Sequence, residues 1–197
     1  MDKLSYVLGM SLGQSLQASG VDSLEFDDFL SGVKVIFSGE EPEISAEQGN
    51  QILQAFQKEK EEAEKREKRK NLAAGQEFLK KNAEEPGVTV TVSGLQYKVI
   101  RDGEGNPPGP HNWVKCNYEG RLIDGKVFDS SYERGLPAKF GLDQVIPGWT
   151  EGLQLMKVGS KYEFYIPANL AYGEVGVPGA IPGNSTLIFT VELLGVL

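Results

Sequence analysis

The sequence predicts an α+β protein: a helical N-terminal part and one long linking helix, followed by a twisted antiparallel sheet that wraps on a single short helix. Three observations lead to this prediction. Near the N-terminus, leucines recur every four residues, which is the spacing of an amphipathic helix. No proline occurs between Pro42 and Pro86, so a long helix is possible there. After Pro86 the pattern changes to the alternation of apolar and polar residues that is typical of strands.

The first 44 residues contain two short amphipathic helices. The first carries an apolar stripe at i+4 spacing, formed by Leu4, Leu8, Leu12 and Leu16, with Gly9 and Gly13 beside it. The second is expected to begin at a cap formed by Asp22 or Ser23 and to end at Gly39. The stripe fits a helix packed within the fold as well as it fits a contact between subunits. Because two such helices bury too little surface to be stable alone, we predict a homodimer through residues 1 to 56, with residues 1–44 as the dimerisation domain.

Residues 45–86 are predicted to form the linking helix. Ser45 and Gln48 match a capping box at its start. Between Lys58 and Lys70 every residue except Ala63 is charged, which leaves no apolar face to bury. This middle part is therefore expected to be a solvated rod that joins two bodies.

Residues 87–197 are predicted to form the second body, with one short helix among its strands. The expected strands are Val88–Val92, Leu95–Arg101, Trp113–Leu122, Lys161–Ile166 and Thr186–Leu194. The short helix lies at Trp149, where Trp149, Leu153 and Met156 follow the helical spacing and Gly159 is a stop signal. Trp149 fits two roles: an ordinary core residue, or the base of an apolar pocket.

Composition and rare residues exclude several functions. A net charge of −8 argues against nucleic-acid binding. No apolar run is long enough for a membrane span, and the N-terminus lacks the apolar segment of a signal peptide. We therefore expect a cytoplasmic location, or a periplasmic or surface location if a signal has been removed. Cys116 and His111 are the only cysteine and the only histidine, so we expect no catalytic Cys-His pair, no metal and no cofactor.

Several motifs occur in order along the second body. They are Tyr118-Glu119-Gly120, Asp124 to Ser131, Val145-Ile146-Pro147-Gly148-Trp149, Ala171-Tyr172-Gly173, Ile181-Pro182 and Leu187-Ile188-Phe189. Together they closely resemble the FK506-binding proteins, a family of peptidyl-prolyl cis-trans isomerases. The helical front part resembles the dimeric Mip-like subgroup of bacterial isomerases, on architecture more than on motif.

The resemblance implies an apolar pocket for a proline ring. The implied catalytic residues are Asp129, Tyr172, Tyr118, Trp149 and Phe189, and the implied substrate-binding residues are Phe128, Val145, Ile146, Ile181 and Ala138. Ala138, Val177 and Ala180 depart from the usual family pattern, in which larger side chains are common. These three departures leave the substrate preference and the affinity for FK506- or rapamycin-type macrolides in doubt. They affect the expectation of isomerase activity less.

The expected substrates are unfolded or partly folded polypeptides that contain proline. In a dimer, a client chain could lie in a cleft between two catalytic bodies. An alternative is a binding module that grips such chains without turnover. The motif residues Asp129, Trp149 and Tyr172 favour the enzyme.

Overall fold

The structure, a computed structural model, describes residues 1–197 and divides them into two compact units, Met1–Gln57 and Lys58–Leu197. The border between the units lies inside the long helix α3 (Ala46–Asn82). The division into domains at residues 44 and 86 stays a prediction.

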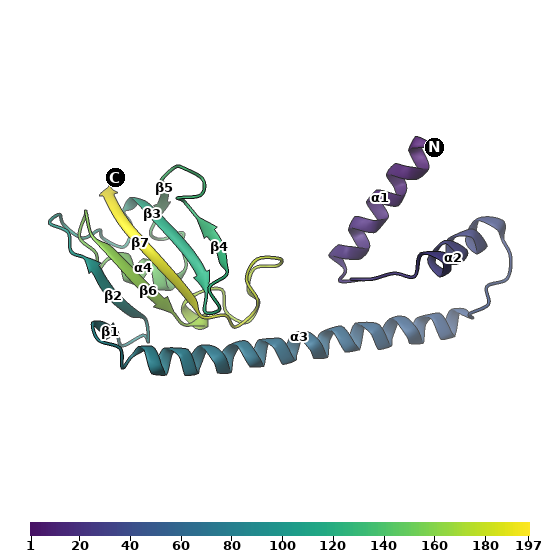
Figure 1. The fold of residues 1–197 in the computed structure, drawn as a ribbon, viewed down its shortest axis with the longest axis horizontal. Coiled ribbons are helices and arrows are strands. Elements are labelled where there is room, and N and C mark those ends of the chain that lie inside the picture. Colours follow the sequence, from purple (N-terminus) through teal and green to yellow (C-terminus); the bar gives the residue numbers. More distant parts are fainter. The chain divides into compact units, whose positions relative to one another are not determined.

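The N-terminal unit is entirely helical (Figure 1). Its helices are α1 (Lys3–Ala18), α2 (Phe26–Ser38) and the first part of α3, as the sequence predicts. The side chain of Asp2 caps α1 by accepting a hydrogen bond of 2.8 Å from the Ser5 backbone N–H. The predicted cap of α2 at Asp22 or Ser23 is wrong, because the helix begins after Glu25, whose side chain makes no capping bond. Gly39 ends α2 in the left-handed conformation, as expected.

Helix α3 begins with the predicted capping box. The Ser45 backbone N–H donates to Gln48 Oε1 at 3.1 Å, and the Gln48 backbone N–H donates to Ser45 Oγ at 3.2 Å. The helix then continues without a break through its charged middle to Asn82. None of the helices combines the length and the apolar character that crossing a membrane requires.

The second unit is built on one antiparallel sheet of seven strands. These are β1 (Val88–Val90), β2 (Gln96–Arg101), β3 (Trp113–Leu122), β4 (Val127–Ser130), β5 (Ala138–Gly141), β6 (Lys161–Ile166) and β7 (Leu187–Val196). They pair in the order β1-β2-β6-β7-β3-β4, and β5 pairs with the other end of β3. Strands β4 and β5 were not predicted from the sequence, because four residues are too few to show a clear alternation.

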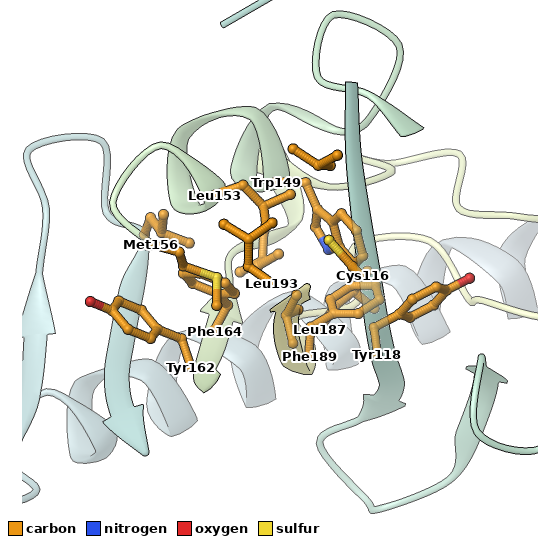
Figure 2. Packing of buried hydrophobic residues seen from close by; sticks show 14 of the residues in the cluster. Cys116, Tyr118, Trp149, Leu153, Met156, Tyr162, Phe164, Leu187, Phe189 and Leu193 are labelled. Carbon is orange, nitrogen blue, oxygen red and sulfur yellow. The ribbon is translucent and has the colours of Figure 1, made fainter. Parts of the chain in front are cut away.

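The core of this unit lies between the sheet and the short helix α4 (Pro147–Leu153). Trp149 and Leu153 of α4 point toward the side chains of Phe164, Phe189 and Leu193 on the strands (Figure 2). Met156 is fully buried although it lies beyond the end of the helix. The predicted fold class, helices followed by a sheet wrapped on one short helix, is confirmed.

Candidate active site

The start of α4 forms the floor of the candidate site. Pro147 occupies the first helical turn, where its missing N–H costs no hydrogen bond. Two residues later the indole of Trp149 is only 4% exposed. Three aromatic rings meet this indole edge-on, those of Tyr118 at 5.1 Å, Phe140 at 5.3 Å and Phe189 at 5.2 Å between ring centroids. These contacts from three strands fix the orientation of the indole plane.

A cavity of about 440 Å³ lies against this floor. Its lining residues are Tyr118, Phe128, Asp129, Phe140, Gln144, Val145, Ile146, Trp149, Tyr172, Val177, Ala180, Ile181 and Phe189. Most of the lining is aromatic or aliphatic, which is the usual composition of a small-ligand pocket. The site can therefore hold a small apolar group out of water.

Gly120 on β3 allows two of the aromatic walls to pack. A Cβ atom at this position would lie 2.6 Å from a Phe189 ring carbon and 2.7 Å from the Phe128 ring. The rings of Phe128 and Phe189 themselves meet edge-on at 5.5 Å. A side chain at position 120 would therefore displace a pocket wall.

The polar groups of the site meet on one wall. The Tyr118 hydroxyl donates a hydrogen bond of 2.5 Å to Asp129 Oδ2 and accepts one of 2.8 Å from Arg134 Nη2. Arg134 Nη1 also donates to Asp129 Oδ1 and forms an ion pair with it. In Figure 2 the Tyr118 hydroxyl points away from the buried cluster. The ring of Tyr118 is thus part of the apolar floor, while its hydroxyl helps to hold the Asp129 carboxylate.

The tyrosine hydroxyls of the site remain protonated at physiological pH. Burial, and then the hydrogen bond to Asp129, raise the pKa of Tyr118 to about 12. Burial also raises the pKa of Tyr172, and the charge of Asp129 adds to this rise. Tyr172 is 41% exposed, and its hydroxyl makes no hydrogen bond to another residue. It is therefore free to donate to a bound molecule.

The cavity lining contains no serine, threonine, cysteine, lysine or histidine that could act as a nucleophile, and the chain offers no group of metal ligands. Cys116 lies fully buried beneath the site, and burial raises the pKa of its thiol to about 12. No three His, Cys, Asp or Glu side chains lie close enough together to hold a metal ion. The site can exclude water from a bound molecule, fit its shape and form hydrogen bonds with it.

Nine of the ten site residues predicted from sequence line this one cavity. The exception is Ala138, which lies on β5 opposite Cys116, packs against the core and is not part of the lining. Val177 and Ala180, predicted to shape the rim, do line the cavity. What these residues contribute to catalysis stays a prediction.

Sequence reasoning missed Phe140, Gln144 and Arg134. Phe140 lies on the missed strand β5, two residues after Ala138, so the alternation of a strand would have placed both on one face. Arg134 lies five residues after Asp129 in a turn, where no periodic pattern announces a contact.

Comparison with known proteins agrees with this geometry. Residues 105–194 match the family model for the FKBP-type peptidyl-prolyl cis-trans isomerase, and residues 1–99 match the model for the domain amino terminal to that isomerase. The chain belongs to the FKBP-type peptidyl-prolyl cis-trans isomerases. The resemblance proposed from sequence is thereby confirmed, and the protein is an enzyme.

Relatives of this isomerase match along nearly its whole length. The FKBP-type 22 kDa peptidyl-prolyl cis-trans isomerase of Escherichia coli is 44% identical, over 98% of this chain and 94% of the relative. Outer membrane protein MIP of Legionella longbeachae is 45% identical, over 99% of this chain and 85% of the relative. The crystal structure of FkpA from Escherichia coli is 43% identical and has a TM-score of 0.73, covering 98% of this chain and 95% of that one.

The names of these relatives bear on location. One relative is named as an outer membrane protein, and none of the names points to the cytoplasm. The expectation of a cytoplasmic location is therefore unsupported, and the expected alternative outside the cytoplasm stays open.

Proposed function

We propose that the isomerase holds the proline ring of an X-Pro segment over Trp149 and accelerates rotation about the preceding amide bond. Planar amides resist rotation by about 18 to 20 kcal/mol because conjugation is lost in the twisted form. The twisted form has less charge separation than the planar one. An apolar pocket that fits the twisted amide therefore binds the transition state more tightly than the ground state.

The polar groups supply orientation. Tyr172 donates its hydroxyl to a carbonyl of the substrate, and Asp129 lies near the amide that rotates. Support for the Asp129 assignment comes from the hydrogen bonds of Tyr118 and Arg134, which hold the carboxylate at the edge of the cavity. No proton is transferred and no covalent bond is broken, which is consistent with the lack of a nucleophile in the lining.

The observation that carries this proposal is the 440 Å³ aromatic cavity, with the Asp129 carboxylate held at its edge by Tyr118 and Arg134. Magnetisation exchange by NMR on a short X-Pro peptide, with catalytic amounts of the full chain, tests it. We expect faster cis-trans exchange and broadened proline signals, both abolished by a macrolide of the FK506 type that competes for the same cavity. Exchange that continues although the macrolide is shown to be bound to the chain would place catalysis elsewhere in the molecule.

We propose further that the protein is a homodimer through residues 1 to 56. Support comes from the N-terminal unit, in which α1 and α2 contain no buried residue. Leu4 and Leu8 of the predicted stripe are 68% and 61% exposed, and Gly9 and Gly13 have open space above their Cα atoms. A second copy of the same unit would cover these faces, and closed twofold symmetry is the commonest arrangement for such a contact.

A dimer would present two pockets to one client. A partly folded chain held between the two catalytic bodies would meet the second pocket at a raised effective concentration. We propose that this is how the protein assists folding, in a compartment outside the cytoplasm. Light scattering tests the dimer, with an expected mass of twice the 21.5 kDa of one chain at micromolar concentration. A monomeric mass would remove the basis of the proposal.

A further inference from the structure

One loop of the second unit supplies much of the pocket rim. This segment, residues 172–184, is called the pocket loop below. It carries four residues that line the cavity, Tyr172, Val177, Ala180 and Ile181. The floor residue Trp149 and the polar residues Tyr118 and Asp129 come from other elements, α4, β3 and β4.

The pocket loop is closed by its own backbone. Val177 and Ile181 exchange two backbone hydrogen bonds, each 2.8 Å, across the tip. At the base, the Asn184 backbone N–H donates to the Gly173 carbonyl oxygen at 2.8 Å. Asn184 has a φ of 59°, and it is the only residue other than glycine with a positive φ in the chain. Such a conformation persists only where surrounding contacts hold it.

The contacts that hold Asn184 in this conformation are with α3. Two amide side chains make them, one donating from α3 to the loop and one from the loop to α3. Asn71 Nδ2 of α3 donates to the Gly183 carbonyl oxygen at 3.1 Å, and Asn184 Nδ2 of the loop donates to the Lys68 carbonyl oxygen at 3.4 Å. We call this pair of hydrogen bonds the amide clasp. Both are partly buried, and they join residues more than a hundred positions apart in the sequence.

The helix and the loop approach closely at the clasp. A Cβ atom at Gly183 would lie 2.9 Å from Lys68 Cε and 2.2 Å from the Glu174 carbonyl oxygen. Further along α3, a Cβ at Gly75 would lie 2.3 Å from Thr186 Oγ1. Lys68, Asn71 and Gly75 lie on one face of α3, since they are three and four residues apart.

Two hollows flank the contact beside the clasp. A hollow of about 340 Å³ opens on one side, lined by Glu64, Lys68 and the tip of the loop. A second hollow of about 330 Å³ is lined by Asn71, Ala74 and the turn after β3. The two amide hydrogen bonds, together with the close approach of Gly183 to Lys68, thus hold the loop against α3.

We propose that Asn71 and Asn184 are positioning residues for the isomerase reaction. By tying the base of the pocket loop to α3, they keep Val177, Ala180 and Ile181 against the cavity. This inference rests on the proposed function of the cavity. Trp149 and Asp129 do not belong to the loop, and Tyr172 lies at its start, where the Gly173 backbone N–H donates to the Ala168 carbonyl oxygen at 2.9 Å. Loosening the clasp therefore weakens substrate binding and leaves the rate of the bound amide nearly unchanged.

Two substitutions in the full chain test the clasp, with kcat and KM measured separately on an X-Pro peptide. Asn71→Asp keeps the size of the side chain but removes the N–H donor. Asn184→Gly removes the amide, while glycine readily adopts the positive φ of this position. For each variant we expect KM to rise about fivefold, which is the change that corresponds to the net free energy of one hydrogen bond. We expect kcat to change by less than about twofold. Gln57→Glu is the control, an exposed amide-to-acid change on the same helix outside the second unit.

The double variant tests whether the two amides act together. If they form one clasp, Asn71→Asp combined with Asn184→Gly raises KM no more than the larger single effect, because the first substitution already frees the loop. Unchanged KM in both single variants would overturn the inference, as would a fall in kcat at constant KM or an equal effect of Gln57→Glu. Activity that survives Trp149→Ala would instead contradict the pocket itself, so the two failures are distinguishable.

Discussion

The two units of this isomerase differ in whether their apolar side chains are exposed or buried. In the N-terminal unit, Leu8 is 61% exposed and Phe37 is 89% exposed, and neither α1 nor α2 buries a residue. In the second unit, Leu95 and Phe164 are fully buried. An amphipathic pattern thus predicts a helix, but it does not say what will cover the apolar face. In one unit the cover comes from distant strands of the same chain, and in the other we propose that it comes from a second chain.

Helix α3 shows the same contrast within one element. From Lys58 to Glu67 its residues are exposed. Lys68, Asn71 and Gly75 instead face the pocket loop and Thr186, which lies just before β7. Near its end, Gln96 accepts a hydrogen bond from Asn82 Nδ2 and donates one to the Leu79 carbonyl oxygen, each 2.8 Å long. The last four turns of α3 are thus the part of the helix that contacts the rest of the catalytic unit.

Deleting the N-terminal unit should have the largest effect. We expect a fragment of residues 58–197 to be a folded monomer, because the whole core lies within it. Its activity on a short X-Pro peptide should stay within about twofold of the full chain, since the cavity is intact. At equal concentration of active sites, its acceleration of a proline-limited refolding reaction should fall by roughly tenfold or more, because paired binding is lost.

A second fragment makes this comparison sharper. Residues 87–197 correspond to the isomerase domain predicted from sequence, and we expect this fragment to stay folded, monomeric and active on short peptides. This fragment lacks α3 and therefore the amide clasp. If the clasp positions the loop, the shorter fragment should have a higher KM than residues 58–197. Equal KM values would show that α3 does not contribute to the pocket.

Replacing the floor of the pocket should have the next largest effect. Trp149→Ala removes the ring that three aromatic side chains enclose, so kcat/KM should fall at least about tenfold and the free energy of unfolding by about 3 to 5 kcal/mol. Trp113→Ala is the matched control, because Trp113 is 48% exposed and lies outside the cavity lining. Cis-trans exchange of an X-Pro peptide gives kcat/KM, and urea denaturation gives the free energy of unfolding. Full activity of Trp149→Ala would refute the pocket assignment.

Removing the carboxylate should have a smaller effect. Asp129→Ala leaves Arg134 and the Tyr118 hydroxyl without their acceptor, so kcat/KM should fall by about fivefold to tenfold. Turnover should not vanish, since an electrostatic contribution is removed and not a nucleophile. Asp129→Asn keeps the shape of the side chain, and its kcat/KM should lie between that of Asp129→Ala and that of the unchanged protein. Complete loss of activity in Asp129→Ala would point to acid-base chemistry that the proposal lacks.

The smallest effect is expected at the rim. Tyr172→Phe removes one hydroxyl and should raise the barrier by about 1 kcal/mol, a factor of about five in kcat/KM, with little change in melting temperature. Tyr132→Phe is the control, because Tyr132 has a similar exposure of 45% and does not line the cavity. A large change in melting for Tyr172→Phe would assign the hydroxyl to stability and not to the substrate.

Secondary structure could be predicted from the sequence wherever a pattern was long enough to repeat. The ten residues of β3, the capping box of α3 and the short helix at Trp149 are all local signals. The site motifs were equally readable, because they stand in family order and spacing. Nine of the ten predicted site residues therefore meet in one cavity.

Contacts between residues that share no sequence pattern became visible only in the folded chain. Phe140 reaches the cavity from a strand of four residues, and Arg134 reaches Asp129 from a turn, where no periodicity exists to read. The face that α3 presents to the catalytic unit includes lysine, asparagine and glycine, which a search for apolar stripes passes over. Such contacts depend on hydrogen bonds between positions more than a hundred residues apart, and their geometry exists only once the chain has folded.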